Sequence, residues 1–155
     1  MTGQYQHSID AKGRVFIPAK LREELGETFY VTMGMDSCLS VYSDASWAKF
    51  TEKFESLPYT KTKAMRPLFA NAAKCEPDKQ GRILLPAELR AYAGLEKDVT
   101  IIGNRNHAEI WATDVWNARR AAVVHLMFNV IGVVVLLTVY CVVKALFAPA
   151  ILDRP

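Results

Sequence analysis

Asp10-Ala11-Lys12-Gly13-Arg14 begins a 17-residue stretch that occurs twice in this chain of 155 residues. The second copy begins with Asp78-Lys79-Gln80-Gly81-Arg82, at an offset of 68 residues, and 8 of the 17 positions in residues 10–26 and 78–94 are identical. Chance would give about one identity in such a window, so the chain contains an internal repeat. Two similar structural units are therefore predicted.

Each copy predicts a turn followed by a short strand and a short helix. Asp10 and Asp78 suit the turn, because a short carboxylate accepts hydrogen bonds from nearby backbone N–H groups. Gly13 and Gly81 then supply a positive φ or a close approach of the backbone. In both copies a proline follows the strand and a glycine follows the helix, where a C-cap belongs.

The apolar triplets at residues 15–17 and 83–85 read as short strands that are buried on both faces. Two more strands are expected in each copy, at residues 29–32, 38–42, 99–102 and 108–111. A unit of about 45 residues is too small to bury a core of its own well. We therefore expect the two halves to pack against each other as a pseudo-dimer.

The repeated Asp-x-x-Gly-Arg with its apolar triplet, Pro-Ala-x-Leu-Arg and downstream glycine resembles the looped-hinge-helix, or AbrB-like, DNA-binding module. The stretches GQYQHSIDAKGRVFIPAKLREELG and CEPDKQGRILLPAELRAYAGLEK are similar to the MraZ family of bacterial transcriptional regulators, a likeness that covers residues 3–116. The resemblance implies a mainly β fold with short helices, in which two swapped-hairpin halves pack as a pseudo-dimer barrel.

Five segments follow from this resemblance and from the hydrophobic pattern. They are two AbrB-like domains at residues 5–47 and 76–119, a helical linker at 48–75, a hydrophobic helix at 120–147 and a tail at 148–155. The linker should contain a helix that starts at Ser43 or Asp44. A second helix is expected over residues 61–73, where Pro67 should kink or end it.

The resemblance also implies what the protein does. It implies a cytoplasmic, nucleoid-associated regulator, acting as a repressor of its own division and cell-wall operon. Such a regulator binds short direct repeats in double-stranded promoter DNA and assembles into rings, with no cofactor. The family's DNA contacts map onto two groups of turn residues, Lys12, Gly13 and Arg14 in the first copy and Lys79, Gly81 and Arg82 in the second.

An exposed arginine in a turn is by itself more often a solvated side chain than a ligand-binding one. The recurrence of Arg14 as Arg82, each after a glycine, favours a functional role. A guanidinium held by a rigid turn can bind guanine O6 and N7 with two hydrogen bonds. Lys12 and Lys79 lack this planar fork and suit phosphates.

Other residues are assigned structural roles. Arg22 and Arg90 also recur, and as helix residues near Glu23 or Glu88 they read as surface ion-pair partners. Asp10 and Asp78 have no partner base, so turn capping is favoured over catalysis. The three cysteines, Cys38, Cys75 and Cys141, have neither disulfide nor zinc spacing. The sequence predicts no metal site, no catalytic residue and no enzyme.

The charge of the chain neither requires nor excludes nucleic acid. Up to residue 120 there are 17 basic and 15 acidic residues, a net charge of +2. A subunit so nearly neutral should bind DNA weakly, and repetition of the basic turns around a homo-oligomer would compensate through effective concentration.

Residues 121–143 contain no Asp, Glu, Lys or Arg. As a helix they would extend about 34 Å, and a bilayer's hydrocarbon core is about 30 Å thick. The MraZ family normally ends in a charged helix, whereas this segment is similar to a membrane segment of sodium/phosphate cotransporters. One span cannot form a transporter, so the segment reads as a fusion, a sequence accident or an unusual anchor.

Three hypotheses remain. The first is the sequence-specific DNA-binding regulator. The second is an antitoxin-like module of the same fold, whose main partner is another protein. The third is a DNA-binding or adaptor protein tethered to the inner membrane through residues 121–143.

Overall fold

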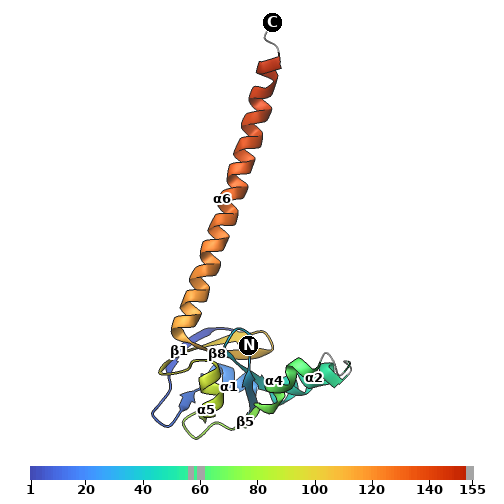
Figure 1. Cartoon of the computed structure of the whole chain (residues 1–155). Coiled ribbons are helices and arrows are strands. Elements are labelled where there is room, and N and C mark those ends of the chain that lie inside the picture. Colours follow the sequence, from blue (N-terminus) through green and yellow to red (C-terminus); the bar gives the residue numbers. More distant parts are fainter. Residues whose placement is uncertain (56–57, 59–61, 153–155) are drawn as a thin grey trace. The chain divides into compact units, whose positions relative to one another are not determined.

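The computed structural model describes residues 1–55, 58 and 62–152 of the chain. It divides into two units, residues 1–116 and the residues from 117 onward. The first unit is mainly β-sheet, whereas the second belongs to one long helix (Figure 1). The first half of the first unit contains β1 (Gln4–Ser8), β2 (Arg14–Phe16), α1 (Ala19–Leu25), β3 (Phe29–Met33), β4 (Leu39–Ser43) and α2 (Asp44–Glu55).

The second half follows a similar order. It contains η1 (Lys63–Met65), α4 (Arg66–Ala70), β5 (Ala73–Cys75), β6 (Arg82–Leu84), α5 (Ala87–Tyr92), β7 (Asp98–Asn104) and β8 (His107–Ala112), and α6 (Thr113–Leu152) comes next. The expected succession of hinge turn, strand, short helix and two further strands is therefore present in both halves. In each half a further strand, β1 or β5, precedes the hinge.

The strands form a six-stranded antiparallel sheet in the order β1-β7-β8-β4-β3-β5. This order exchanges the halves, because β1 of the first half pairs with β7 of the second, and β5 pairs with β3. At the centre, Ser40 of β4 pairs with Glu109, its equivalent in β8. The predicted tandem halves are confirmed, and they are related by an approximate twofold axis.

The sheet does not close into the expected barrel. Strands β1 and β5 stay at opposite edges, and β2 and β6 form a separate two-stranded ladder. A single bridge between Ile9 and Val15 links this ladder to the chain that follows β1. The hinge turn of residues 10–14 lies between β1 in the sheet and β2 in the ladder.

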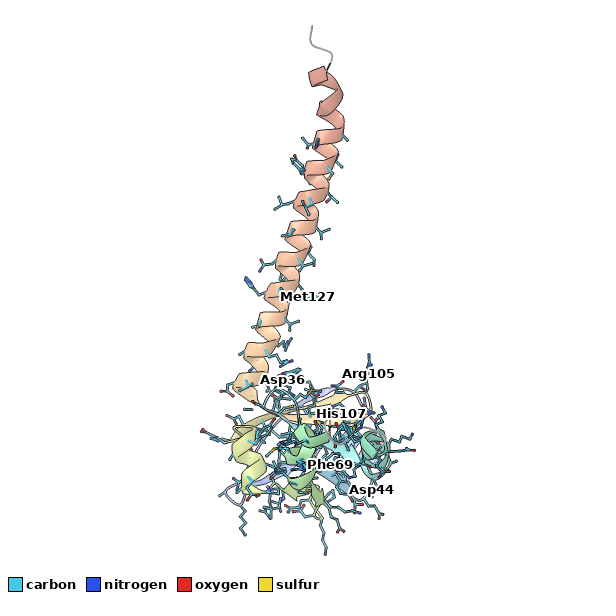
Figure 2. All side chains as sticks on the ribbon, turned by 45° about the vertical axis from the view of Figure 1, so that its right-hand side comes forward. Asp36, Asp44, Phe69, Arg105, His107 and Met127 are labelled. Atoms are coloured by element: carbon cyan, nitrogen blue, oxygen red, sulfur yellow. The ribbon has the colours of Figure 1, made fainter. Side chains whose placement is uncertain are left out.

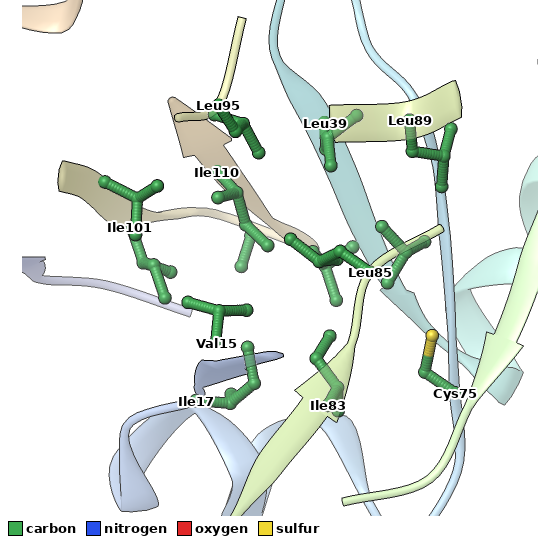
Figure 3. Close-up of a cluster of buried hydrophobic side chains, with 14 of the residues drawn as sticks. Val15, Ile17, Leu39, Cys75, Ile83, Leu85, Leu89, Leu95, Ile101 and Ile110 are labelled. Atoms are coloured by element: carbon green, nitrogen blue, oxygen red, sulfur yellow. The ribbon is translucent and has the colours of Figure 1, made fainter. Parts of the chain in front are cut away.

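The core lies between the ladder and the sheet (Figure 3). Val15 and Ile83 are 0% and 1% exposed and face the core, whereas Leu84 is 62% exposed. Successive side chains of a strand point to opposite faces, so only one face of the ladder is covered. The prediction that these strands are buried on both faces is wrong.

The linker differs in part from expectation. Helix α2 has the predicted N-cap, because Ser43 Oγ accepts a hydrogen bond of 3.2 Å from the backbone N–H of Ser46. The second predicted helix begins at residue 61, outside the described residues, and its predicted end at residue 73 is wrong because Ala73 begins β5. Pro67 occupies the first turn of α4, where its missing N–H removes no helical hydrogen bond.

Candidate nucleic-acid interface

The two hinge turns, residues 10–14 and 78–82, are built in the same way. The Asp10 Oδ1 atom accepts hydrogen bonds of 2.9 Å from the backbone N–H groups of Lys12 and Arg14. Asp78 does the same, at 2.9 Å, for the second and fourth residues after it. The turn-capping role predicted for both aspartates is confirmed.

Both hinge glycines adopt the positive φ that was predicted, +80° at Gly13 and +76° at Gly81. Each glycine also accepts a hydrogen bond from the opposite half. The backbone N–H of Ile17 donates to the Gly81 carbonyl at 2.9 Å, and that of Leu85 donates to the Gly13 carbonyl at 3.0 Å. Each turn is therefore held by the strand end of the other half.

The carboxylates also hold the two hinge arginines. Arg14 Nε and Nη2 both lie 2.7 Å from Asp10 Oδ2. Arg82 Nε and Nη2 lie 3.0 Å and 2.8 Å from Asp78 Oδ2. Arg82 Nη1 reaches across to the first turn and lies 3.8 Å from Asp10 Oδ2. The structure thus brings both predicted arginines together around one carboxylate.

These contacts keep both carboxylates ionised. The side-chain hydrogen bond from Arg14, followed by that residue's backbone N–H, lowers the pKa of Asp10 to about 2. For Asp78, the backbone N–H of Arg82 is the largest cause of a lowered pKa, followed by the Arg82 side chain. At neutral pH each hinge therefore carries a charged Asp–Arg pair.

The register of the ladder places the arginines on one face. Arg14 pairs with Leu84, and Phe16 pairs with Arg82. Because Val15 and Ile83 point into the core, these four side chains share the outer face of the ladder. That face presents two guanidinium groups, each side by side with an apolar residue.

Arg22 and Arg90 have a role that the sequence reading missed. Arg22 Nε donates to the Ile17 carbonyl at 3.0 Å, and a Cβ placed on Gly81 would lie 2.8 Å from its guanidinium carbon. Arg90 makes the same contacts with Leu85, at 3.2 Å, and with Gly13, at 3.0 Å. Among the described residues neither arginine has an ion pair with a helix glutamate, so that prediction is wrong. Both arginines instead pack against the hinge glycine of the other half.

The two hinge lysines are exposed, but they are not equivalent to each other. At the repeat offset Lys12 corresponds to Gln80, and Lys79 corresponds to Ala11. The halves therefore present one lysine each from different positions of the turn. Among the described residues, no group of three or more His, Cys, Asp or Glu is placed to hold a metal ion.

The family follows from comparison with known proteins. A family model described as "MraZ protein, putative antitoxin-like" matches residues 1–66 and 68–125, and each match contains one hinge turn. The chain belongs to the MraZ family. Most of the apolar part of α6 lies beyond the second match.

Several curated MraZ relatives carry the name "Transcriptional regulator MraZ". The relative from Carboxydothermus hydrogenoformans is 53% identical over 118 residues, 74% of this chain and 82% of its own. The relative from Acetivibrio thermocellus is 53% identical over 119 residues, 75% and 83% of the two chains. The relative from Desulforamulus reducens is 47% identical over 122 residues, 77% and 86% of the two chains. Transcriptional regulators of this kind are not a class of enzymes.

Proposed function

We propose that this chain is a sequence-specific transcriptional regulator that grips double-stranded DNA with its two hinge turns. The observation that carries the proposal is the meeting of Arg14 and Arg82 around Asp10 on one outer face. The names of the relatives support the same function.

The chemistry of this outer face suits base recognition. The guanidinium groups of Arg14 and Arg82 have the fork that binds guanine O6 and N7, and the aspartates fix the direction of each fork. The exposed Leu84 beside Arg14 suits contact with a thymine methyl group. Lys12 and Lys79 at the rim suit phosphate oxygens, which position a protein without reading sequence.

The regulator acts in the cytoplasm, where it represses its own division and cell-wall operon by binding short direct repeats in the promoter. A net charge of +2 on residues 1–120 gives each subunit little general attraction for DNA. Assembly into a homo-oligomeric ring would link several weak sites and raise their joint affinity.

An antitoxin-like function is the second candidate, because the family description itself includes those words. In that case the main partner of the AbrB-like fold is another protein. Purification of the full chain from its own host separates the two candidates. A small protein that co-purifies in a fixed ratio and displaces DNA would favour the antitoxin-like function.

The direct test is a gel-shift titration with DNA from upstream of the chain's own gene. Arg14→Ala and Arg82→Ala should each weaken binding about 10- to 100-fold, because a bidentate arginine–guanine contact contributes about 1–3 kcal/mol of discrimination. Lys49→Ala, an exposed residue of α2, removes the same charge away from the hinges and should bind like wild type.

Lys12→Gln distinguishes a phosphate contact, which positions the protein on DNA, from a base contact, which recognises the sequence. It should reduce the slope of log affinity against log salt by about 0.9 and weaken binding to all DNA sequences alike. The proposal is wrong if both arginine variants bind the operator as tightly as wild type while remaining folded.

A further inference from the structure

Helix α6 carries an apolar surface that nothing in the described structure covers. Residues 121–143 contain no Asp, Glu, Lys or Arg. The large apolar side chains from Val123 to Val143 are 45–70% exposed. Around Met127 and further along the helix, side chains project to all sides (Figure 2). Thr113–Ala145 is long and apolar enough to cross a membrane by length and composition.

The distribution of these side chains identifies what covers them. A helix that packs on a protein surface has an apolar stripe on one side and polar residues on the other. Here residues 133–137 read Val-Val-Val-Leu-Leu, and five consecutive positions at 3.6 residues per turn cover the whole circumference. One neighbouring helix would cover one side only, whereas lipid hydrocarbon surrounds a helix completely.

The length and the ends of the segment fit a bilayer. Its helical length of about 34 Å spans a hydrocarbon core of about 30 Å with some tilt. Arg119 and Arg120 precede it and Lys144 follows it, so cationic groups flank both ends at headgroup level. Within the segment, Thr138 Oγ1 donates to the carbonyls of Val134 and Val135 at 2.9 Å and 2.8 Å. Its hydroxyl therefore needs no water.

We propose that α6 is a transmembrane anchor and that the chain is a regulator fixed to the membrane. The first unit lies on the cytoplasmic side of the membrane in this proposal. That assignment rests on the proposed function, because DNA is in the cytoplasm, and the Arg119-Arg120 pair agrees with it by the positive-inside rule. The insertion itself rests only on the residues of α6. Such an anchor limits the regulator to DNA that approaches the membrane.

The test uses the full chain, reconstituted into vesicles of phosphatidylcholine and phosphatidylglycerol, washed with alkaline carbonate and floated on a density gradient. Val134→Arg with Leu137→Arg places two charges at mid-span, where a charged side chain is most costly. Ala118→Arg with Ala121→Arg adds the same charges at the same spacing next to the existing arginine pair. Wild type and this end variant should float, and the mid-span variant should float at least tenfold less.

The thiol of Cys141 gives a second measurement on the native chain. Cys38 and Cys75 are 2% and 8% exposed, so Cys141 is the exposed cysteine among the described residues. A water-soluble maleimide should label Cys141 slowly in vesicles that contain wild type and rapidly in the mid-span variant. Equal rapid labelling of both would overturn the proposal.

Further measurements distinguish failure of the membrane anchor from failure of the proposed DNA binding. If wild type is removed by carbonate, or stays soluble as a detergent-free oligomer, α6 is a protein-packing helix and the anchor is wrong. In detergent the mid-span variant should bind operator DNA like wild type, because its substitutions lie outside residues 1–116. Loss of operator binding by wild type itself would count against the proposed function and leave the anchor standing.

Discussion

Arg82 reaches from the second hinge turn to Asp10 of the first, with its Nη1 3.8 Å from the Asp10 Oδ2 that also binds Arg14. Two residues 72 positions apart in the chain are thus joined at the outer face of the ladder. Asp10 therefore binds both arginines, whereas Asp78 binds residues of its own turn. The interface is symmetric in its backbone and asymmetric in its charges.

Asp10→Asn should change DNA selectivity without destroying the turn. An asparagine Oδ1 still accepts the backbone N–H groups of Lys12 and Arg14. Arg14 loses its charged partner, whereas Arg82 loses its 3.8 Å contact with the first turn and keeps Asp78. Affinity for non-operator DNA should rise, because a negative charge near the phosphates is gone. The ratio of operator to non-operator affinity should fall about tenfold, because the guanidinium fork of Arg14 is no longer oriented.

Fluorescence anisotropy with the two DNAs at one salt concentration measures this ratio. Glu52→Gln on α2 is the matched control, with the same change of charge away from the hinges. An unchanged ratio in Asp10→Asn would show that Asp10 does not position the arginines.

Gly81→Ala should destabilise the fold more than Gly94→Ala. Both glycines have positive φ, +76° and +59°, so an alanine at either costs about 1–2 kcal/mol of backbone strain. A Cβ on Gly94 meets open space, whereas one on Gly81 would lie 2.8 Å from the guanidinium carbon of Arg22.

Urea unfolding of the full chain in one mild detergent measures the difference. We expect Gly81→Ala to lose about 1 kcal/mol more than Gly94→Ala, because the arginine must move out of its packed position. Equal losses in the two variants would mean that the Arg22 contact contributes nothing to the fold.

Truncation of two neighbouring residues of β6 should have very different effects on the free energy of unfolding. Ile83 is 1% exposed and Leu84 is 62% exposed. Ile83→Ala should therefore lower the free energy of unfolding by about 2–5 kcal/mol. Leu84→Ala should change it by less than about 0.5 kcal/mol. If Leu84 contacts a thymine methyl group, its variant should instead weaken operator binding. A large loss of stability in Leu84→Ala would contradict the register of the ladder.

Acid should weaken the sheet at Glu109. Its carboxylate lies 3.2 Å from Nε2 of His107 and accepts hydrogen bonds from Asn104 and Trp111 at 2.8 Å. The hydrogen bond from His107 is the largest cause of a pKa lowered from 4.5 to about 2. A lowered carboxyl pKa stabilises the fold above pH 4.5 and stops doing so as the pH falls through about 2.

Glu109→Gln should remove this part of the pH dependence. Between pH 4.5 and 2, wild type should lose on the order of 2 kcal/mol more than the variant. Urea unfolding followed by tryptophan fluorescence at several pH values measures both. Parallel pH profiles for the two proteins would show that the Glu109 carboxylate titrates alike in the folded and unfolded chains.

The repeat made the two halves, the hinge glycines and the capping aspartates predictable, because each is set by a short stretch of sequence. Long-range pairing was not predictable in this way. Nothing within residues 10–26 shows that Arg22 packs on Gly81, because that contact joins two halves of the chain. The sequence also did not predict that the sheet stays open. The pairing of β1 with β7 joins strands from different halves, and no short stretch of sequence determines it.

The local sequence also does not show which side chains of a short strand face the core and which face solvent. Residues 83–85 are Ile, Leu and Leu, and this uniform apolar triplet does not reveal that the middle residue is exposed. The assignment of DNA contacts to Lys12, Gly13, Arg14, Lys79, Gly81 and Arg82 remains a prediction. The structure adds a geometric reason for the two arginines, and the gel-shift series tests Arg14, Arg82 and Lys12 directly.

The presence of both hinge turns in one chain has a genetic consequence. In a true homodimer, every mutation appears in both hinges at once, so the pair must recognise a palindrome. Here one gene encodes both hinges separately, and they already differ at Ala11 against Lys79 and at Phe16 against Leu84. Selection can therefore tune each hinge to its own few base pairs, which frees the chain to read a site with direction along the DNA.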